Sequence, residues 1–322
     1  MKGHSLPPLC LHGQIWQALF FIPLFMLTFQ VPSITIPEQV QLLRDKGLTI
    51  STQDDVEHWL SHVSYFRLKN YSDKLKNAQT GNFLSNSTFA QVIKLYLFDR
   101  DLKFVLFDAI ETIEVSIKTL ISNSMSNAYG THWYMERQHF LPSFNFDDFL
   151  SSVEKDTSTS HEYAVKRYRQ SYNEPSLPPS WMIFESLSFG TVSKIFEHLA
   201  DRTIKLAICW KYNLPDNVFV NWLHCITQLR NRCAHHSCII YRSMAKTIIL
   251  PSRSKHKFLT EVSQIDLSSL YATLCCMQFL INKIQPASNF KTKLLQLIED
   301  NPDIDYKHMG FTEHWRKEQI WL

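Results

Sequence analysis

The fold of this chain is decided by residues 88–126, which read TFAQVIKLYLFDRDLKFVLFDAIETIEVSIKTLISNSMS. Apolar residues recur here every three or four positions, which is the spacing of one buried face of an α-helix. Thr88 and Gln91 have the spacing of a capping box at its start, and Gly130 marks its end. We therefore expect one long core helix, or two helices with a short break.

Helical patterns continue on both sides of this segment, and no run of alternating residues predicts a β-strand. Only 7 glycines occur, and sheet-rich folds usually need more of them for hairpins and bulges. The helices expected outside the central segment are 37–43, 54–71, 181–199 with a break near Gly190, one that starts at Asp216, and one that is capped by Asp266 and ends at Ile284. The sequence thus predicts an all-α fold.

Composition places the chain among globular proteins. Hydrophobic residues make up 45% of the 322 residues and charged residues 20%. The net charge of +3 neither supports nor excludes RNA as a partner, because a local basic cleft is enough for an enzyme. The seven cysteines are odd in number and irregularly spaced, which favours reduced thiols in the cytosol over a disulfide framework.

The first residues form a separate feature. Residues 1–32 are a hydrophobic extension whose apolar run extends from Ile15 to Val31, and residues 33–322 are one helical domain. A signal peptide fits the apolar length, but no cleavage site follows. A membrane anchor fits less well, since the run is short and contains Pro23. A third interpretation is that translation starts later, at Met26.

One short motif carries candidate chemistry: Arg230-Asn231-Arg232-Cys233-Ala234-His235. On a helix of about 100° per residue, Asn231 and His235 lie on one polar side, in line with His224. Arg230 falls on the apolar side, where its charge must be satisfied because an unpaired buried charge is very costly.

These residue types suit RNA cleavage without a metal. A histidine titrates near neutral pH and can move the proton of a 2′-hydroxyl or of a leaving group. An arginine can hold the phosphate, and an asparagine can orient either group. The alternative is structural: Arg230 and His235 merely close the C-terminus of a helix, where cations are favoured.

For two further groups of residues, the evidence for a functional role is weaker. Cys233, His235, His236 and Cys238 lie too close together on a helix to form one tetrahedral zinc site, so no metal and no cofactor is expected. A basic segment could touch the RNA backbone, but a solvated basic face is the favoured interpretation; its residues are Lys166, Arg167 and Arg169.

The motifs in their order along the chain resemble the Abi (abortive infection) family of the AbiD and AbiF type. The resemblance covers roughly residues 34–321. The residues that carry it are Ser64-Tyr65-Phe66-Arg67-Leu68 with Tyr71, Phe98-Asp99-Arg100 with Leu102, Ile110-Glu111 with Ile113-Glu114, Trp181 with Glu185, Leu187-Ser188-Phe189-Gly190, Arg230 to His236, and Met309-Gly310-Phe311 with Trp315.

This resemblance implies a branch of the HEPN superfamily, with a bundle of long antiparallel helices and additional helices. It implies a metal-independent endoribonuclease whose site forms where two motif copies meet in a homodimer. Arg230 and His235 would take the central roles, Asn231 a supporting role, and His236 is a possible stand-in. His224, from its position in line with the motif, could extend the site, but a surface histidine is the favoured interpretation. The expected partners are substrate RNA and an inhibitory RNA or protein antitoxin.

The resemblance also bears on the first residues and on rival functions. It begins near Ile34, which favours a later start and a cytoplasmic protein without stable membrane association; retention of residues 15–31 would instead make the protein membrane-anchored. The alternative function is a non-catalytic RNA-binding or protein-interaction module that keeps only the helical core.

Overall fold

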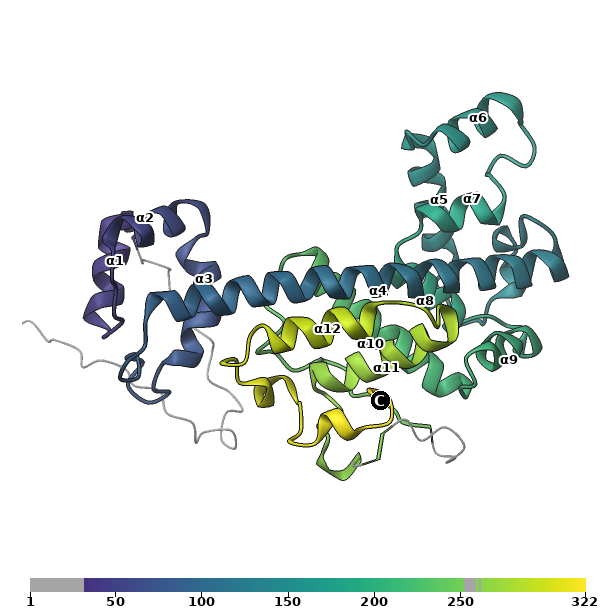
Figure 1. Cartoon of the computed structure of the whole chain (residues 1–322). Coiled ribbons are helices and arrows are strands. Elements are labelled where there is room, and N and C mark those ends of the chain that lie inside the picture. The colour runs from purple at the N-terminus through teal and green to yellow at the C-terminus, as the bar shows by residue number, and fades with distance from the viewer. Residues whose placement is uncertain (1–31, 252–258, 261) are drawn as a thin grey trace, which may run out of the picture.

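The computed structural model describes residues 32–251, 259–260 and 262–322 (Figure 1). In these residues the chain forms twelve α-helices and no β-strand, so the predicted all-α fold is confirmed. Residues 1–31, with the apolar run from Ile15 to Val31, lie outside the described residues. Within the described ranges, no helix is both long and apolar enough to cross a membrane.

The helices differ widely in length, and several short 3₁₀ turns join them. Their bounds are α1 Ile36–Asp45, α2 Gln53–His62, α3 Tyr65–Ser72, α4 Phe89–Tyr129, α5 Phe146–Thr159, α6 Tyr163–Ser171, α7 Ser180–Ser186, α8 Phe189–Glu197, α9 Arg202–Lys211, α10 Asp216–Ala234, α11 Leu270–Ile284 and α12 Phe290–Glu299.

The central segment forms one unbroken helix, α4, of 41 residues. Its capping box is present, because Thr88 accepts from the backbone N–H of Gln91 while the Gln91 side chain accepts from that of Thr88. Gly130 ends the helix with a φ of +87°, a value that glycine adopts readily. Figure 1 shows α4 running the length of the molecule, with α1–α3 near one end and α5–α7 near the other.

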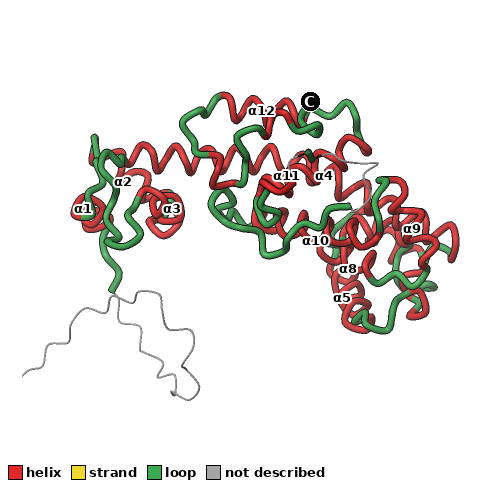
Figure 2. The backbone as a smooth tube through the Cα atoms, turned by 90° about the horizontal axis from the view of Figure 1, so that it is seen from below, coloured by secondary structure: helices red, strands yellow, loops and turns green. Residues whose placement is uncertain are grey.

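The core lies along α4, where α10, α11 and α12 pack against it. Helix α11 is buried on every side from Leu270 to Ile281, and Figure 2 shows it between α10 and α12. The C-terminal aromatics cover one end of α11: Phe311 and Trp321 surround Tyr271, and the indole N–H of Trp321 donates to the Tyr271 hydroxyl at 3.2 Å.

Two predicted helix boundaries need correction. The segment 54–71 is not one helix, because Val63 is extended and Ser64 starts α3 by accepting from the backbone N–H of Arg67. Helix α11 is capped by Ser269 rather than by Asp266. The Asp266 carboxylate accepts from the backbone and hydroxyl of Ser268, which closes a turn before the helix. The expected break near Gly190 separates α7 from α8.

Candidate functional site

Helix α10 carries the motif and is held by its apolar face. Pro215 precedes its first turn and Asp216 places a negative charge there, both favourable at a helix start. The helix packs against α8, α4, α11 and α9. The apolar face that the spacing predicts is fully buried, and it consists of Trp222, Leu223, Ile226, Leu229 and Cys233.

Two histidines close the C-terminus of α10. His235 is the last half-helical residue, and His236 takes the left-handed conformation with a φ of +54°. The backbone N–H of His236 donates to the Cys233 carbonyl at 3.0 Å, and that of Ser237 donates to the Arg232 carbonyl at 2.9 Å. This pair of bonds is a Schellman motif. Both histidine side chains remain exposed beyond the helix end.

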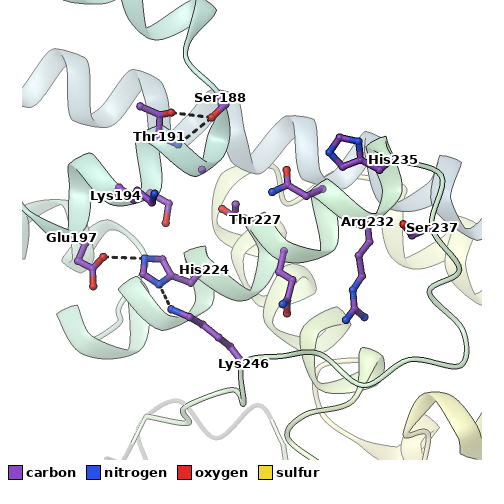
Figure 3. A pocket seen from close by; sticks show the side chains of 14 residues that line it. Ser188, Thr191, Lys194, Glu197, His224, Thr227, Arg232, His235, Ser237 and Lys246 are labelled. Carbon is purple, nitrogen blue, oxygen red and sulfur yellow. Dashed lines mark hydrogen bonds and ion pairs between the residues drawn. The ribbon is translucent and has the colours of Figure 1, made fainter. Parts of the chain in front are cut away.

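One side of α10 borders a cavity of about 620 Å³ that it shares with α8 (Figure 3). Asn231, His235 and His224 all line it, as their helical spacing predicts. The other lining residues are Ser188, Gly190, Thr191, Ser193, Lys194, Glu197, Thr227, Gln228, Arg232, Ser237 and Lys246.

A row of three side chains crosses this cavity, and Figure 3 shows His224 in its middle. Nε2 of His224 lies 3.3 Å from Oε2 of Glu197, and Nζ of Lys246 lies within hydrogen-bond distance of Nδ1. Burial lowers the pKa of His224 below its ordinary value of 6.5, Glu197 opposes this shift, and Lys246 adds to it. The imidazole is therefore neutral at pH 7, with Nδ1 accepting from the ammonium group and the hydrogen on Nε2.

Most of the charged side chains that line this cavity are cations. In the described ranges it contains Lys194, Arg232 and Lys246 but only one carboxylate, that of Glu197. The guanidinium of Arg232 is directed at the following loop, where it donates to the carbonyl of Ser243 at 2.8 Å. The two lysines are thus the cations best placed to meet an anion.

Arg230 lies on a different side of α10. Its Nε is 3.8 Å from Oε2 of Glu114 on α4, and Glu114 also pairs with Lys118 at 2.8 Å. Arg230 lines a second cavity of about 540 Å³ whose other members include four carboxylates, those of Asp108, Glu111, Glu114 and Glu185. Within one copy of the chain, the structure does not bring Arg230 into the cavity that holds His235.

The loop that follows the motif is anchored by Asp99 of α4, which is fully buried. Its Oδ1 accepts from the backbone N–H groups of Ile239 and Ile240 at 2.9 and 3.1 Å. Its Oδ2 accepts from the Tyr71 hydroxyl at 2.7 Å and pairs with Lys103 at 2.5 Å. One carboxylate therefore ties α3, α4 and the loop after α10 together.

Helix α3 adds two more contacts to the same loop. Arg67 donates to the carbonyl of His236 at 2.7 Å, and Arg242 donates to the side-chain oxygen of Asn70 at 2.9 Å. From the sequence, the family resemblance was the only sign that Arg67, Tyr71 and Asp99 matter. The structure gives them a shared role, which is to position the chain directly behind the motif.

The cysteines and histidines near the motif point in different directions. Cys233 and Cys238 are buried, and burial raises the pKa of their thiols to about 12 and about 11. His235 and His236 are exposed. In the ranges that the structure describes, no three His, Cys, Asp or Glu side chains are grouped so that they could hold a metal ion.

The basic residues Lys166, Arg167 and Arg169 are exposed on α6, which Figure 1 shows at the tip of the α5–α7 group and away from α10. Arg169 donates to the backbone carbonyl of Ser158 at 2.7 Å, so it closes the end of α5. The structure does not bring these three residues to the motif.

Several cavity residues were missed by sequence reasoning. Lys194 and Glu197 are three positions apart on α8, opposite its buried residues Val192 and Ile195, so the amphipathic pattern of that helix could have identified them. Lys246 lies in a loop, where no periodicity exists to place it.

A comparison with protein families matches residues 58–241 to the family described as Abi-like protein. The matched range contains α3, α4, α8 and the whole of α10. A comparison with curated proteins and one with solved structures gave no match. Since the matched range covers more than half of the 322 residues, the chain belongs to the Abi-like protein family.

Proposed function

We propose that this protein is a cytoplasmic, metal-independent endoribonuclease of the HEPN type that acts in abortive infection. Membership of the Abi-like family supports the role in phage defence. The observation that carries the enzymatic part is the cavity between α8 and α10, where Asn231, His235 and His224 face two lysines.

The proposed reaction is a transesterification within RNA. The 2′-oxygen attacks the adjacent phosphorus while a histidine removes its proton, and the 5′-oxygen leaves with a proton from a second group. The products are a 2′,3′-cyclic phosphate and a 5′-hydroxyl. His224, whose lowered pKa keeps it neutral, removes the 2′-hydroxyl proton, and His235, which is exposed, supplies the proton to the leaving 5′-oxygen from its imidazolium form. Asn231 orients the scissile phosphate.

The position of Arg230 supports a homodimer. Within one chain it lines a cavity other than that of His235, so a partner copy is needed for both residues to meet the same phosphate. A nuclease that acts on cellular RNA must also be restrained before infection, and we propose that an inhibitory RNA or a protein antitoxin does this.

A second function is favoured by one specific contact. Because Arg230 pairs with Glu114 in the single chain, its charge is satisfied without any phosphate. This contact favours a non-catalytic RNA-binding or protein-interaction module, and the following experiment separates the two.

The test is cleavage of single-stranded RNA by the purified full-length protein in excess EDTA. We expect fragments that end in a 2′,3′-cyclic phosphate. His235→Ala should lower the rate by about 10²–10⁴-fold, the usual contribution of a positioned acid or base. Arg230→Ala should lower it strongly as well, because the developing charge on the phosphate loses its partner. A mixture of the two variants should regain activity if the site is shared between copies.

Matched controls are His314→Ala and Arg202→Ala, which replace exposed residues of the same types outside α10. Both should cleave at the wild-type rate. RNA binding without cleavage by the wild type would establish the non-catalytic function. Equal cleavage by all four variants would show that Arg230 and His235 take no part in the reaction. Induction of the same variants in a bacterial host, with total RNA followed over time, tests the reaction in cells.

A further inference from the structure

The cavity between α8 and α10 contains polar atoms that lack partners. In the described part of the chain, five buried side-chain nitrogen or oxygen atoms make no hydrogen bond. Three of them belong to residues that line this one cavity, namely Oγ of Ser193, Oγ1 of Thr227 and Nε2 of His224. Buried polar atoms nearly always have a partner in the protein, a water or a ligand. Their grouping therefore points to a ligand with several polar atoms.

The residues that carry these buried atoms line one wall of the cavity. Ser193 lies on α8 and is only 2% exposed, while Thr227 lies one turn from both His224 and Asn231 on α10. Gly190 sits opposite Thr227, and a Cβ at that glycine would lie 3.5 Å from the threonine methyl. A methyl group at position 190 would thus rest against Thr227 in ordinary van der Waals contact. Nε2 of His224 has the Glu197 carboxylate at 3.3 Å but without good hydrogen-bond geometry.

The charge and shape of the cavity narrow the class of ligand. Lys194 and Lys246 supply positive charge, and the volume of about 620 Å³ falls within the roughly 300–1,000 Å³ of small-molecule sites. Among the residues that the structure describes, no Phe, Tyr, Trp or aliphatic side chain lines it. It therefore offers hydroxyl and cationic partners but none of the large Phe, Tyr or Trp rings on which nucleobases are usually stacked.

We propose that this cavity binds one ribose-phosphate unit of a ribonucleotide. Lys194 and Lys246 hold the phosphate, and the hydroxyls of Ser193 and Thr227 exchange hydrogen bonds with the ribose hydroxyls. The base projects out of the cavity and is not distinguished. The inference rests on the proposed function, because RNA supplies the ribose-phosphate, but it concerns binding and is measured without cleavage.

The first test is titration calorimetry on the full-length protein with four probes: adenosine 5′-monophosphate, its 2′-deoxy form, adenosine and inorganic phosphate. The ribonucleotide should bind most tightly, and higher salt should weaken its binding. The deoxy form should bind several-fold more weakly, and adenosine should not bind measurably. Equal affinity for the ribose and deoxyribose forms, or for inorganic phosphate and the nucleotide, would overturn the proposal.

Variants locate the bound nucleotide. Lys246→Met should weaken binding by about tenfold or more, and Ser193→Ala by about three- to tenfold, which are the effects of losing a charged and a neutral hydrogen bond. Lys211→Met removes an exposed lysine at the end of α9 and is the charge-matched control, with unchanged affinity expected. Unchanged affinity in both Lys246→Met and Ser193→Ala, with thermal unfolding like that of the wild type, would refute the site.

Replacing the base gives an independent check. Adenosine, guanosine, cytidine and uridine monophosphates should bind with affinities within about threefold of one another, since no Phe, Tyr or Trp ring of the described lining favours one base. A strong preference for one base would contradict the proposed orientation. If nucleotides bind here but the protein does not cleave RNA, the proposed function fails and this site stands. If RNA is cleaved but no nucleotide binds, the reverse holds.

Discussion

The two sides of α10 differ in charge and in the residues they recruit. Towards α8, Asn231 and His235 share a cavity with Lys194 and Lys246 and with a single carboxylate. Towards α4, Arg230 shares a cavity with four carboxylates and one lysine. Residues five positions apart on a helix are turned by about 140°, so the two ends of the motif cannot face the same way. One short motif therefore serves two separate surfaces of the same chain.

This difference shows what each surface needs. The side towards α8 has the composition of an anion-binding site. The side towards α4 neutralises its own arginine, because Nε of Arg230 faces the carboxylate of Glu114. Substitutions on the two sides of α10 should therefore differ in their effects, and the largest effect is expected for the residue that supports the loop after the motif.

The largest expected effect comes from Asp99→Ala. This change leaves Lys103 without its partner and two backbone N–H groups unsatisfied in a buried place, so the free energy of unfolding should fall by about 3–5 kcal/mol. Urea unfolding measures it. Asp101→Ala, two residues along the same helix and about half exposed, is the control and should change stability little. Equal effects of the two changes would mean that Asp99 does not anchor the loop.

The next largest effect separates the two arginines of the motif. Arg232 donates to the carbonyls of Ser243 and Arg242, so Arg232→Ala should lower the free energy of unfolding by about 1–3 kcal/mol. Arg230→Ala removes only a long ion pair and should lower it by less than about 1 kcal/mol. The comparison fails if Arg230→Ala proves the more destabilising in thermal or urea unfolding.

A smaller effect distinguishes one carboxylate on each side. Glu197→Gln removes the charge that faces His224, and under the proposed function it should slow RNA cleavage by about tenfold or more, since orientation of the imidazole is lost. Glu114→Gln, its counterpart beside Arg230, frees that arginine and should not slow cleavage. Single-turnover rates measure both. A slower Glu114→Gln variant would show that the ion pair itself is required.

The smallest effect is a pH dependence. Burial holds the pKa of His224 below 6.5 in the folded chain, so the unfolded chain takes up the proton first as the pH falls. The stability linked to this group is present above pH 6.5 and is lost as the pH falls from 6.5 through the lowered folded value. His224→Gln should flatten the stability curve between pH 7 and 5. An unchanged slope in that variant would assign the dependence to other groups.

Features that depend on neighbouring residues could be predicted from the sequence. The periodicity of 88–126 predicts α4, and the spacing of Trp222 to Cys233 predicts the buried face of α10. The same spacing places Asn231 and His235 together with His224. Local errors occur where one residue leaves the helical conformation, as Val63 does between α2 and α3.

Features that depend on distant residues could not be predicted in this way. Asp99 and Ile239 are 140 residues apart, and no local pattern indicates that they meet. The same holds for Glu114 with Arg230 and for Lys246 with His224. The buried hydroxyls of Ser193 and Thr227 form one wall only because α8 packs on α10.

Because α4 is unbroken, it fixes the distance and the rotation between the contacts that its residues make. At a rise of about 1.5 Å per residue, Asp99 and Glu114 stay about 22 Å apart along one rigid axis. A single inserted residue between them would rotate one contact against the other by about 100°, so the loop anchor and the Arg230 pair could not both form. Changes of length are therefore tolerable in the connecting loops, whereas this stretch of α4 must keep its number of residues.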